Sequence, residues 1–155
     1  MTVTITRESP LTEDLALLFA RHTAHCHADT PPESIHMMDR AGLDRPEISF
    51  FVLRDAGVPM AMGALKEIEP GHGEVKSMHV LDEARGRGFA RRLVDHLIAT
   101  AQDMGLTRLS LETGAQDSFA PARALYAAAG FVECPPFLGY KPDPMSVFMT
   151  RDIGR

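Results

Sequence analysis

The stretch Met78–Ala90 reads MHVLDEARGRGFA and passes from an apolar segment through a basic, glycine-rich turn into a long amphipathic segment. Gly86 and Gly88 have no side chain that would keep a ligand away from the backbone. The first turn of a following helix has free N–H groups, and its dipole favours an anion. Arg85 and Arg87 add positive charge. The pattern indicates a phosphate cradle, although a purely structural tight turn could use the same residues.

Two common phosphate-binding motifs do not fit this turn. A dinucleotide fingerprint requires Gly-x-Gly-x-x-Gly within a parallel β-α-β unit, but Arg91 stands at the sixth position. The loop that binds nucleoside triphosphates ends in Gly-Lys-Ser or Gly-Lys-Thr, and this turn does not. The segments before the turn also favour an antiparallel arrangement, which argues against the first motif again.

The chain around the turn predicts a mixed α/β domain. Ile48–Leu53, Val58–Ile68 and Glu74–Leu81 have strand-like composition and are separated by turn residues, as in an antiparallel meander. Apolar residues recur at helical spacing from Phe89 towards Gly105, so a long amphipathic helix follows the cradle. Elsewhere we expect strands over Val3–Glu8, Arg108–Thr113, Phe131–Cys134 and Met145–Thr150, and helices over Leu11–Cys26 (capped by Thr12), Ser34–Ala41 and Pro121–Ala129.

These residues resemble the GNAT superfamily of acyl-CoA N-acyltransferases. The signature of that family is Arg or Gln, two residues, Gly, one residue, then Gly or Ala, and Arg85, Gly88 and Ala90 match it. A second landmark, a helix with a tyrosine followed by Gly-Phe and a strand, is matched by residues 124–131. The resemblance covers residues 48–153 and implies an α/β (α+β) GNAT fold, in which helices flank a central mixed, mostly antiparallel and splayed sheet.

The resemblance also implies a cofactor and an activity. The activity would be N-acetyl transfer from acetyl-CoA to a primary amine of a small molecule, peptide or lysine, by direct transfer in a ternary complex. The strand before the turn would bind the pantetheine arm through its backbone at Met78 and Val80, and the turn would hold the pyrophosphate. The implied cofactor-binding residues are Met78, His79, Val80, Arg85, Gly86, Arg87, Gly88, Phe89 and Ala90.

One departure from the family pattern leaves an alternative function open. Many relatives carry Asn near the start of the tyrosine helix, whereas this sequence has Phe119 at about that place. The same fold could therefore serve as an acetyl-CoA-binding sensor or partner module without turnover.

Acetyl transfer to an amine needs a neutral nucleophile, stabilisation of the oxyanion and a proton for the departing thiolate. The resemblance assigns the base to Glu74, the acid to Tyr126 and the oxyanion contact to a backbone N–H near Val80. The alternation of a strand places Glu74, Lys76 and Met78 on one face. Glu74 could instead be a solvated acid or the ion-pair partner of Lys76, and Tyr126 could be a core residue.

The acceptor pocket is expected to involve the first two helices. Ser34, His36 and Lys76 are the predicted substrate-binding residues. The segment 22–27 contains three histidines and one cysteine, but one helix supplies at most about three ligands, so no metal is expected. The sequence leaves open which amine is used, whether Glu74 acts directly or through water, and whether the acyl group is longer than acetyl.

Composition narrows the remaining possibilities. The chain has 155 residues, 45% hydrophobic and 24% charged, which is typical of one globular domain over 1–155. A formal charge of −5 argues against nucleic-acid or membrane partners. Two cysteines and a start without a signal pattern favour a cytoplasmic protein. The family resemblance adds the possibility of a homodimer.

Overall fold

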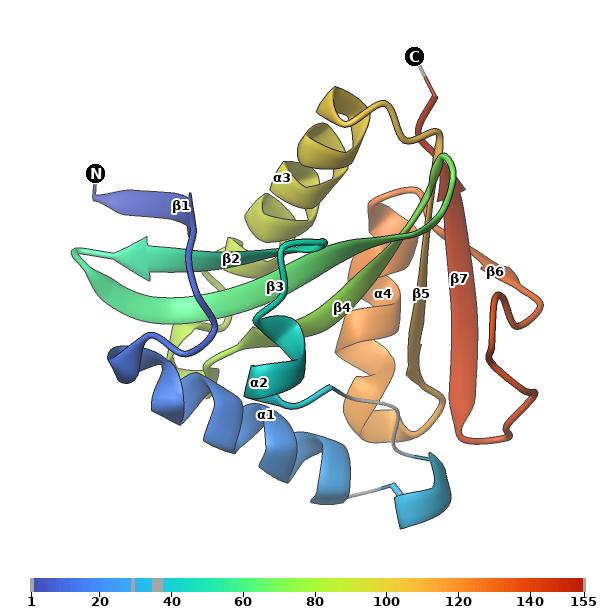
Figure 1. Cartoon of the computed structure of the whole chain (residues 1–155). Helices are drawn as coiled ribbons and strands as arrows, with labels where there is room; N and C mark the ends of the chain where they lie inside the picture. The colour runs from blue at the N-terminus through green and yellow to red at the C-terminus, as the bar shows by residue number, and fades with distance from the viewer. Residues whose placement is uncertain (1, 29, 35–37, 155) are drawn as a thin grey trace.

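The computed structural model describes residues 2–28, 30–34 and 38–154, and its centre is one sheet in the order β1-β2-β3-β4-β5-β7-β6 (Figure 1). The first four strands form an antiparallel meander, β4 and β5 are parallel, and the last three are again antiparallel. The expected mixed, mostly antiparallel sheet is confirmed. The strands are β1 (Val3–Arg7), β2 (Ile48–Asp55), β3 (Val58–Glu69), β4 (His72–Val80), β5 (Arg108–Gly114), β6 (Val132–Cys134) and β7 (Ser146–Asp152).

Helices cover both faces of the sheet (Figure 1). Phe50 of β2 stacks on Phe19 with ring centroids 5.7 Å apart, whereas the next residue, Phe51, meets His96 on the opposite face at 4.7 Å. Period-two alternation in β2 therefore buries an aromatic ring on each side. Among the helices that the structure describes, none has the length and apolarity needed to cross a membrane. The helices are α1 (Ala16–Ala28), α2 (Arg40–Leu43), α3 (Phe89–Asp103) and α4 (Ala120–Ala128), with 3₁₀ turns η1 (Glu13–Leu15), η2 (Pro32–Ser34), η3 (Asp82–Ala84) and η4 (Asp117–Phe119).

Strands β4 and β5 separate in the middle of the sheet. Their pairing covers His72–Glu74 against Arg108–Ser110 and then ends, although β4 continues to Val80 and β5 to Gly114. Figure 1 shows the two strands close together at one end and apart at the other. The expected splay is present, and it opens the sheet directly before the glycine-rich turn.

A bulge in β4 changes which side chains share a face. Ala64 of β3 pairs with Lys76, but Met62, two residues earlier, pairs with His79, three residues later. The extra residue lies next to Ser77, which has a φ of +56°. Glu74 and Lys76 share a face and contact each other, but the prediction that Met78 shares it is wrong, because the bulge reverses the alternation. The sulfur of Met78 instead lies over Gly63, beside Leu93 and Leu97 of α3.

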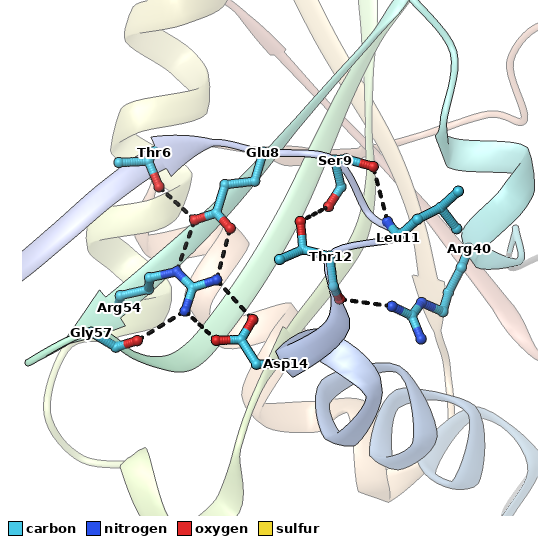
Figure 2. Close-up of polar contacts among 9 residues, drawn as sticks. All are labelled: Thr6, Glu8, Ser9, Leu11, Thr12, Asp14, Arg40, Arg54 and Gly57. Carbon is cyan, nitrogen blue, oxygen red and sulfur yellow. Dashed lines mark hydrogen bonds and ion pairs between the residues drawn. The ribbon is translucent and has the colours of Figure 1, made fainter.

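The segment before α1 is held to β1 and β2 by Arg54 (Figure 2). Its guanidinium donates to both oxygens of Glu8, at 2.9 and 2.8 Å, and to both oxygens of Asp14, at 2.7 and 2.9 Å. Thr12 stands at the N-cap position of η1, but the predicted capping by its side chain is wrong, because its hydroxyl donates to the carbonyl of Ser9 at 2.7 Å. The hydrogen bonds of Arg54 to Glu8 and Asp14, rather than a cap at Thr12, therefore attach the start of this helical segment to the sheet.

The helix predicted over Ser34–Ala41 is wrong in the part that the structure describes. Ser34 ends η2, residues 35–37 lie outside the described residues, and α2 begins only at Arg40. The carboxylate of Asp39 accepts a hydrogen bond from the N–H of Gly42 at 2.7 Å and so caps a new, short helix. A strong N-cap residue inside the predicted helix explains the later start.

Candidate active site

A cleft of about 360 Å³ follows the end of β4, the glycine-rich turn and the first turns of α3 and α4. We call it the turn cleft. Gly86 and Gly88 have φ values of +82° and +78°, a backbone conformation that favours glycine. A Cβ added at either glycine would meet nothing within 4 Å, so the space over them is open to a ligand. Of the predicted cofactor-binding residues, Met78, His79, Val80, Arg85, Gly86, Gly88, Phe89 and Ala90 line the turn cleft.

Arg87 is the predicted cofactor residue that does not line the turn cleft. Its guanidinium forms an ion pair with Asp55 and lies 4.4 Å from the centre of the Phe89 ring. Arg91, whose charge the sequence also placed at the turn but which was not among the predicted cofactor-binding residues, lines the cleft and donates to the carbonyl of Ala128 at 3.2 Å. Its place three residues after Gly88, on the first turn of α3, was the available signal.

A second cavity of about 150 Å³ lies in the splay between β4 and β5, and we call it the inner pocket. Ser34 and Lys76, two predicted substrate-binding residues, line it together with Glu74. The third predicted substrate residue, His36, lies outside the described residues.

The turn cleft and the inner pocket meet at four residues. His25, Met78, Ala122 and Tyr126 line both cavities. Tyr126 is buried, and its ring packs edge-on against Phe131 at 5.9 Å. Burial raises the pKa of Tyr126, so its hydroxyl remains protonated and able to donate at neutral pH. A ligand in one cavity would therefore reach a ligand in the other beside Tyr126.

Glu74 is buried in the inner pocket with both carboxylate oxygens engaged. One oxygen lies 3.2 Å from Nζ of Lys76, and the other accepts a hydrogen bond from the hydroxyl of Tyr140 at 2.7 Å. Tyr140 comes from the loop between β6 and β7, where its ring packs on Phe137 and Phe148 at 5.1 and 5.4 Å. The ion pair between Glu74 and Lys76 that the sequence left open is thus present.

Glu112 is a second carboxylate in the inner pocket, and sequence reasoning missed it. It lies on β5, two residues beyond the point where β4 and β5 stop pairing. Burial raises the pKa of Glu112 to about 7, and the charge of Glu74 adds to the rise. The available signal was an acid within a predicted strand, between Leu111 and Thr113. Its position opposite β4 depends on the order of the strands in the sheet, which a local pattern does not give.

Three histidines line the α1 side of these cavities. The rings of His22 and His25 lie 5.4 and 6.2 Å from the ring of His79. Burial, together with the neighbouring histidines, lowers the pKa of His22 and of His79 to about 4. Within residues 2–28, 30–34 and 38–154, no three His, Cys, Asp or Glu residues are placed to hold a metal ion. His25 also stacks on Phe119, with centroids 4.5 Å apart.

This arrangement can be compared with known proteins. The profile of the Acetyltransferase (GNAT) family matches residues 13–131, which include the splay, the turn and Tyr126. The chain belongs to the GNAT acetyltransferase family. The family resemblance seen in the sequence is confirmed, and the sheet that opens beside a glycine-rich turn is the fold that was expected of a GNAT member.

Relatives of this GNAT chain span most of its length. The uncharacterized N-acetyltransferase YsnE of Bacillus subtilis is 44% identical over 132 residues, covering 83% of this chain and 87% of the relative. The IAA acetyltransferase of Azospirillum brasilense is 40% identical over 152 residues, covering 97% and 98%. The PaiA N-acetyltransferase of Thermoplasma acidophilum, solved with coenzyme A, superposes with a TM-score of 0.77 at 15% identity over 98% and 99% of the two chains. The last likeness is one of fold.

Proposed function

We propose that this GNAT member is an acetyl-CoA-dependent N-acetyltransferase that acetylates a primary amine by direct transfer in a ternary complex. The observation that carries the proposal is the meeting of the turn cleft and the inner pocket at Tyr126. A donor in one cavity and an acceptor in the other would bring thioester and amine together without a covalent intermediate on the protein.

Acetyl-CoA fits the turn cleft by its chemistry. The pyrophosphate would lie on the backbone N–H groups at the start of α3, over Gly86 and Gly88, with Arg85 and Arg91 at the rim. The pantetheine arm would follow β4 at Met78 and Val80, where no β5 strand pairs with it. Arg85 is exposed and lies 3.1 Å from Asp82, so it can exchange that contact for a phosphate.

Tyr126 and a carboxylate of the inner pocket would move the protons. The amine nitrogen attacks the thioester carbonyl carbon, the C–S bond breaks, and the thiolate takes a proton from Tyr126. Glu74 was the expected base and would take the amine proton directly or through water. Glu112 is a second candidate for the base. Both carboxylate oxygens of Glu74 already contact Lys76 or Tyr140, whereas the pKa of Glu112 is about 7.

The test combines binding with turnover. We expect acetyl-CoA and CoA, but not NADH or ATP, to raise the Tm, since a ligand at 100 times its Kd stabilises by about 2.7 kcal/mol. Release of CoA with a panel of amines then measures turnover. Tyr126→Phe should lower kcat by roughly 10²-fold or more while leaving the CoA-induced Tm shift unchanged.

The outcomes separate the two functions that the sequence left open. A Tm shift with CoA release shows an enzyme, whereas a Tm shift without CoA release from any amine indicates an acetyl-CoA-binding module. No shift with either acetyl-CoA or CoA overturns the assignment of the turn cleft.

A further inference from the structure

The charged groups of the inner pocket favour a cation. Among the described residues that line it, Glu74 and Glu112 are acidic and Lys76 is basic. The pocket therefore has an excess of negative charge before any ligand enters.

The basic side chain of the inner pocket, Lys76, already forms an ion pair. Nζ of Lys76 lies 3.2 Å from Glu74, and the Lys76 side chain is only 13% exposed. By contrast, no cation among the described residues forms an ion pair with Glu112. A cationic ligand would meet a carboxylate that it can pair with, whereas an anionic ligand would have to break an existing pair.

The uncharged polar atoms of the inner pocket point to the same ligand chemistry. Nδ1 of His22 and Oγ of Ser77 are buried and have no hydrogen-bond partner among the described residues. Both residues line the pocket, and the low pKa of His22 keeps its ring uncharged at neutral pH. They can hydrogen-bond a neutral amide or hydroxyl, but they supply no positive charge for a carboxylate.

We propose that the acceptor enters as an ammonium ion without a carboxylate next to its amino group, and that Glu112 is the residue that pairs with it. This inference rests on the proposed function, because it names the acceptor class of the same site. It favours the α-amines of peptides and amino amides, and small amines, over free α-amino acids. The cavity of about 150 Å³ limits the part inserted to a small group.

The test uses matched acid and amide pairs, which differ in charge but hardly in size. Alanine and alaninamide, and glycine and glycinamide, are titrated calorimetrically into the protein saturated with CoA at pH 7.5. We expect each amide to bind at least about tenfold more tightly than its acid, because like charges in a buried site repel. Equal or tighter binding of the acids, or no binding of any compound, overturns the proposal.

Two variants assign the effect to Glu112. Glu112→Gln keeps the size and removes the charge, so it should weaken amide binding at least about tenfold and reduce the preference over the acids. Glu133→Gln, at an exposed position on β6, is the matched control and should bind as the unmodified protein does. An unchanged preference in Glu112→Gln contradicts the role of Glu112.

Turnover is measured separately on the same compounds. CoA release that follows the binding preference supports both the acceptor class and the enzymatic function. A binding preference without CoA release leaves the acceptor class standing and contradicts the enzyme. CoA release with the free amino acids as good acceptors supports the enzyme and overturns the acceptor class.

Discussion

At the scale of single residues, Glu74 and Glu112 differ in what surrounds them. Glu74 contacts Nζ of Lys76 and the hydroxyl of Tyr140, whereas burial and neighbouring acids raise the pKa of Glu112. Glu74 could be singled out from the sequence, because its distance from Arg85 is a local property. Glu112 could not be singled out, because it lies in the pocket with Glu74 only through the parallel pairing of β5 with β4. That pairing joins segments that are far apart in the chain.

Glu112→Gln should stabilise the protein at alkaline pH. The folded-state pKa of about 7 lies above the usual value of 4.5, so ionisation of Glu112 costs folding free energy as the pH rises from about 4.5 through 7. The amide removes that cost, which amounts to at most about 3 kcal/mol for a shift of this size. Urea unfolding at pH 8.5 and at pH 4.5 measures it.

The comparison with pH 4.5 is the internal control. There the carboxyl is protonated when folded, and the variant should gain little. Glu133→Gln, whose side chain is exposed on β6, should change stability at neither pH. A gain that is equal at both pH values would show that Glu112 acts through packing rather than through its charge.

At the scale of elements, the sequence predicted what depends on local pattern. Helix α3 runs over Phe89–Asp103, as its apolar stripe indicated, and the meander from β2 to β4 follows the turn residues. The bulge at Ser77 was missed, because a serine with positive φ is imposed by the strands around it. A side chain placed from strand alternation, such as that of Met78, then moved to the opposite face.

Arg54→Lys should loosen the attachment of β1 and η1 to β2. A lysine keeps the positive charge but cannot donate in a fork to both Glu8 and Asp14. Because the Arg54 side chain is 16% exposed and that of Asp14 is 53% exposed, we expect a modest loss of about 1–2 kcal/mol. Thermal unfolding measures it.

The control for this change is Arg45→Lys. Arg45 is exposed and makes no side-chain ion pair among those that the structure describes, so its replacement should leave the Tm unchanged. If Arg54→Lys is equally neutral, the network drawn in Figure 2 does not contribute measurably to stability.

At the scale of the whole molecule, buried histidines should make the fold sensitive to mild acid. The pKa values of His22 and His79 are about 4 when folded and near 6.5 in an unfolded chain. The unfolded state therefore binds more protons between these values, and the free energy of unfolding falls as the pH drops from about 6.5 towards 4. Glu112, with its raised pKa, acts in the opposite direction over the same range and offsets part of this loss. We expect a net loss of about 1–2 kcal/mol between pH 7 and pH 5, measurable by urea unfolding at pH 7, 6 and 5.

His22→Asn tests whether histidines carry this effect. The slope of stability against pH between 6.5 and 5 should become shallower in the variant. His27→Asn, at an exposed position on α1, should keep the original slope. A slope that is unchanged in His22→Asn would assign the acid sensitivity to other groups.

The splay between β4 and β5 also has a mechanical meaning. A sheet whose two middle strands share pairing over only three residues behaves as two leaves joined along a short seam. One leaf carries the glycine-rich turn and α3, and the other carries Glu112 and α4, so the turn cleft has a wall on each leaf. The loop of Tyr140 reaches across the gap to Glu74. Both cavities lie at this splay and share the lining residues His25, Met78, Ala122 and Tyr126. A ligand that changed the spacing of the two leaves would therefore alter the other ligand's cavity as well, so binding of donor and of acceptor would be coupled.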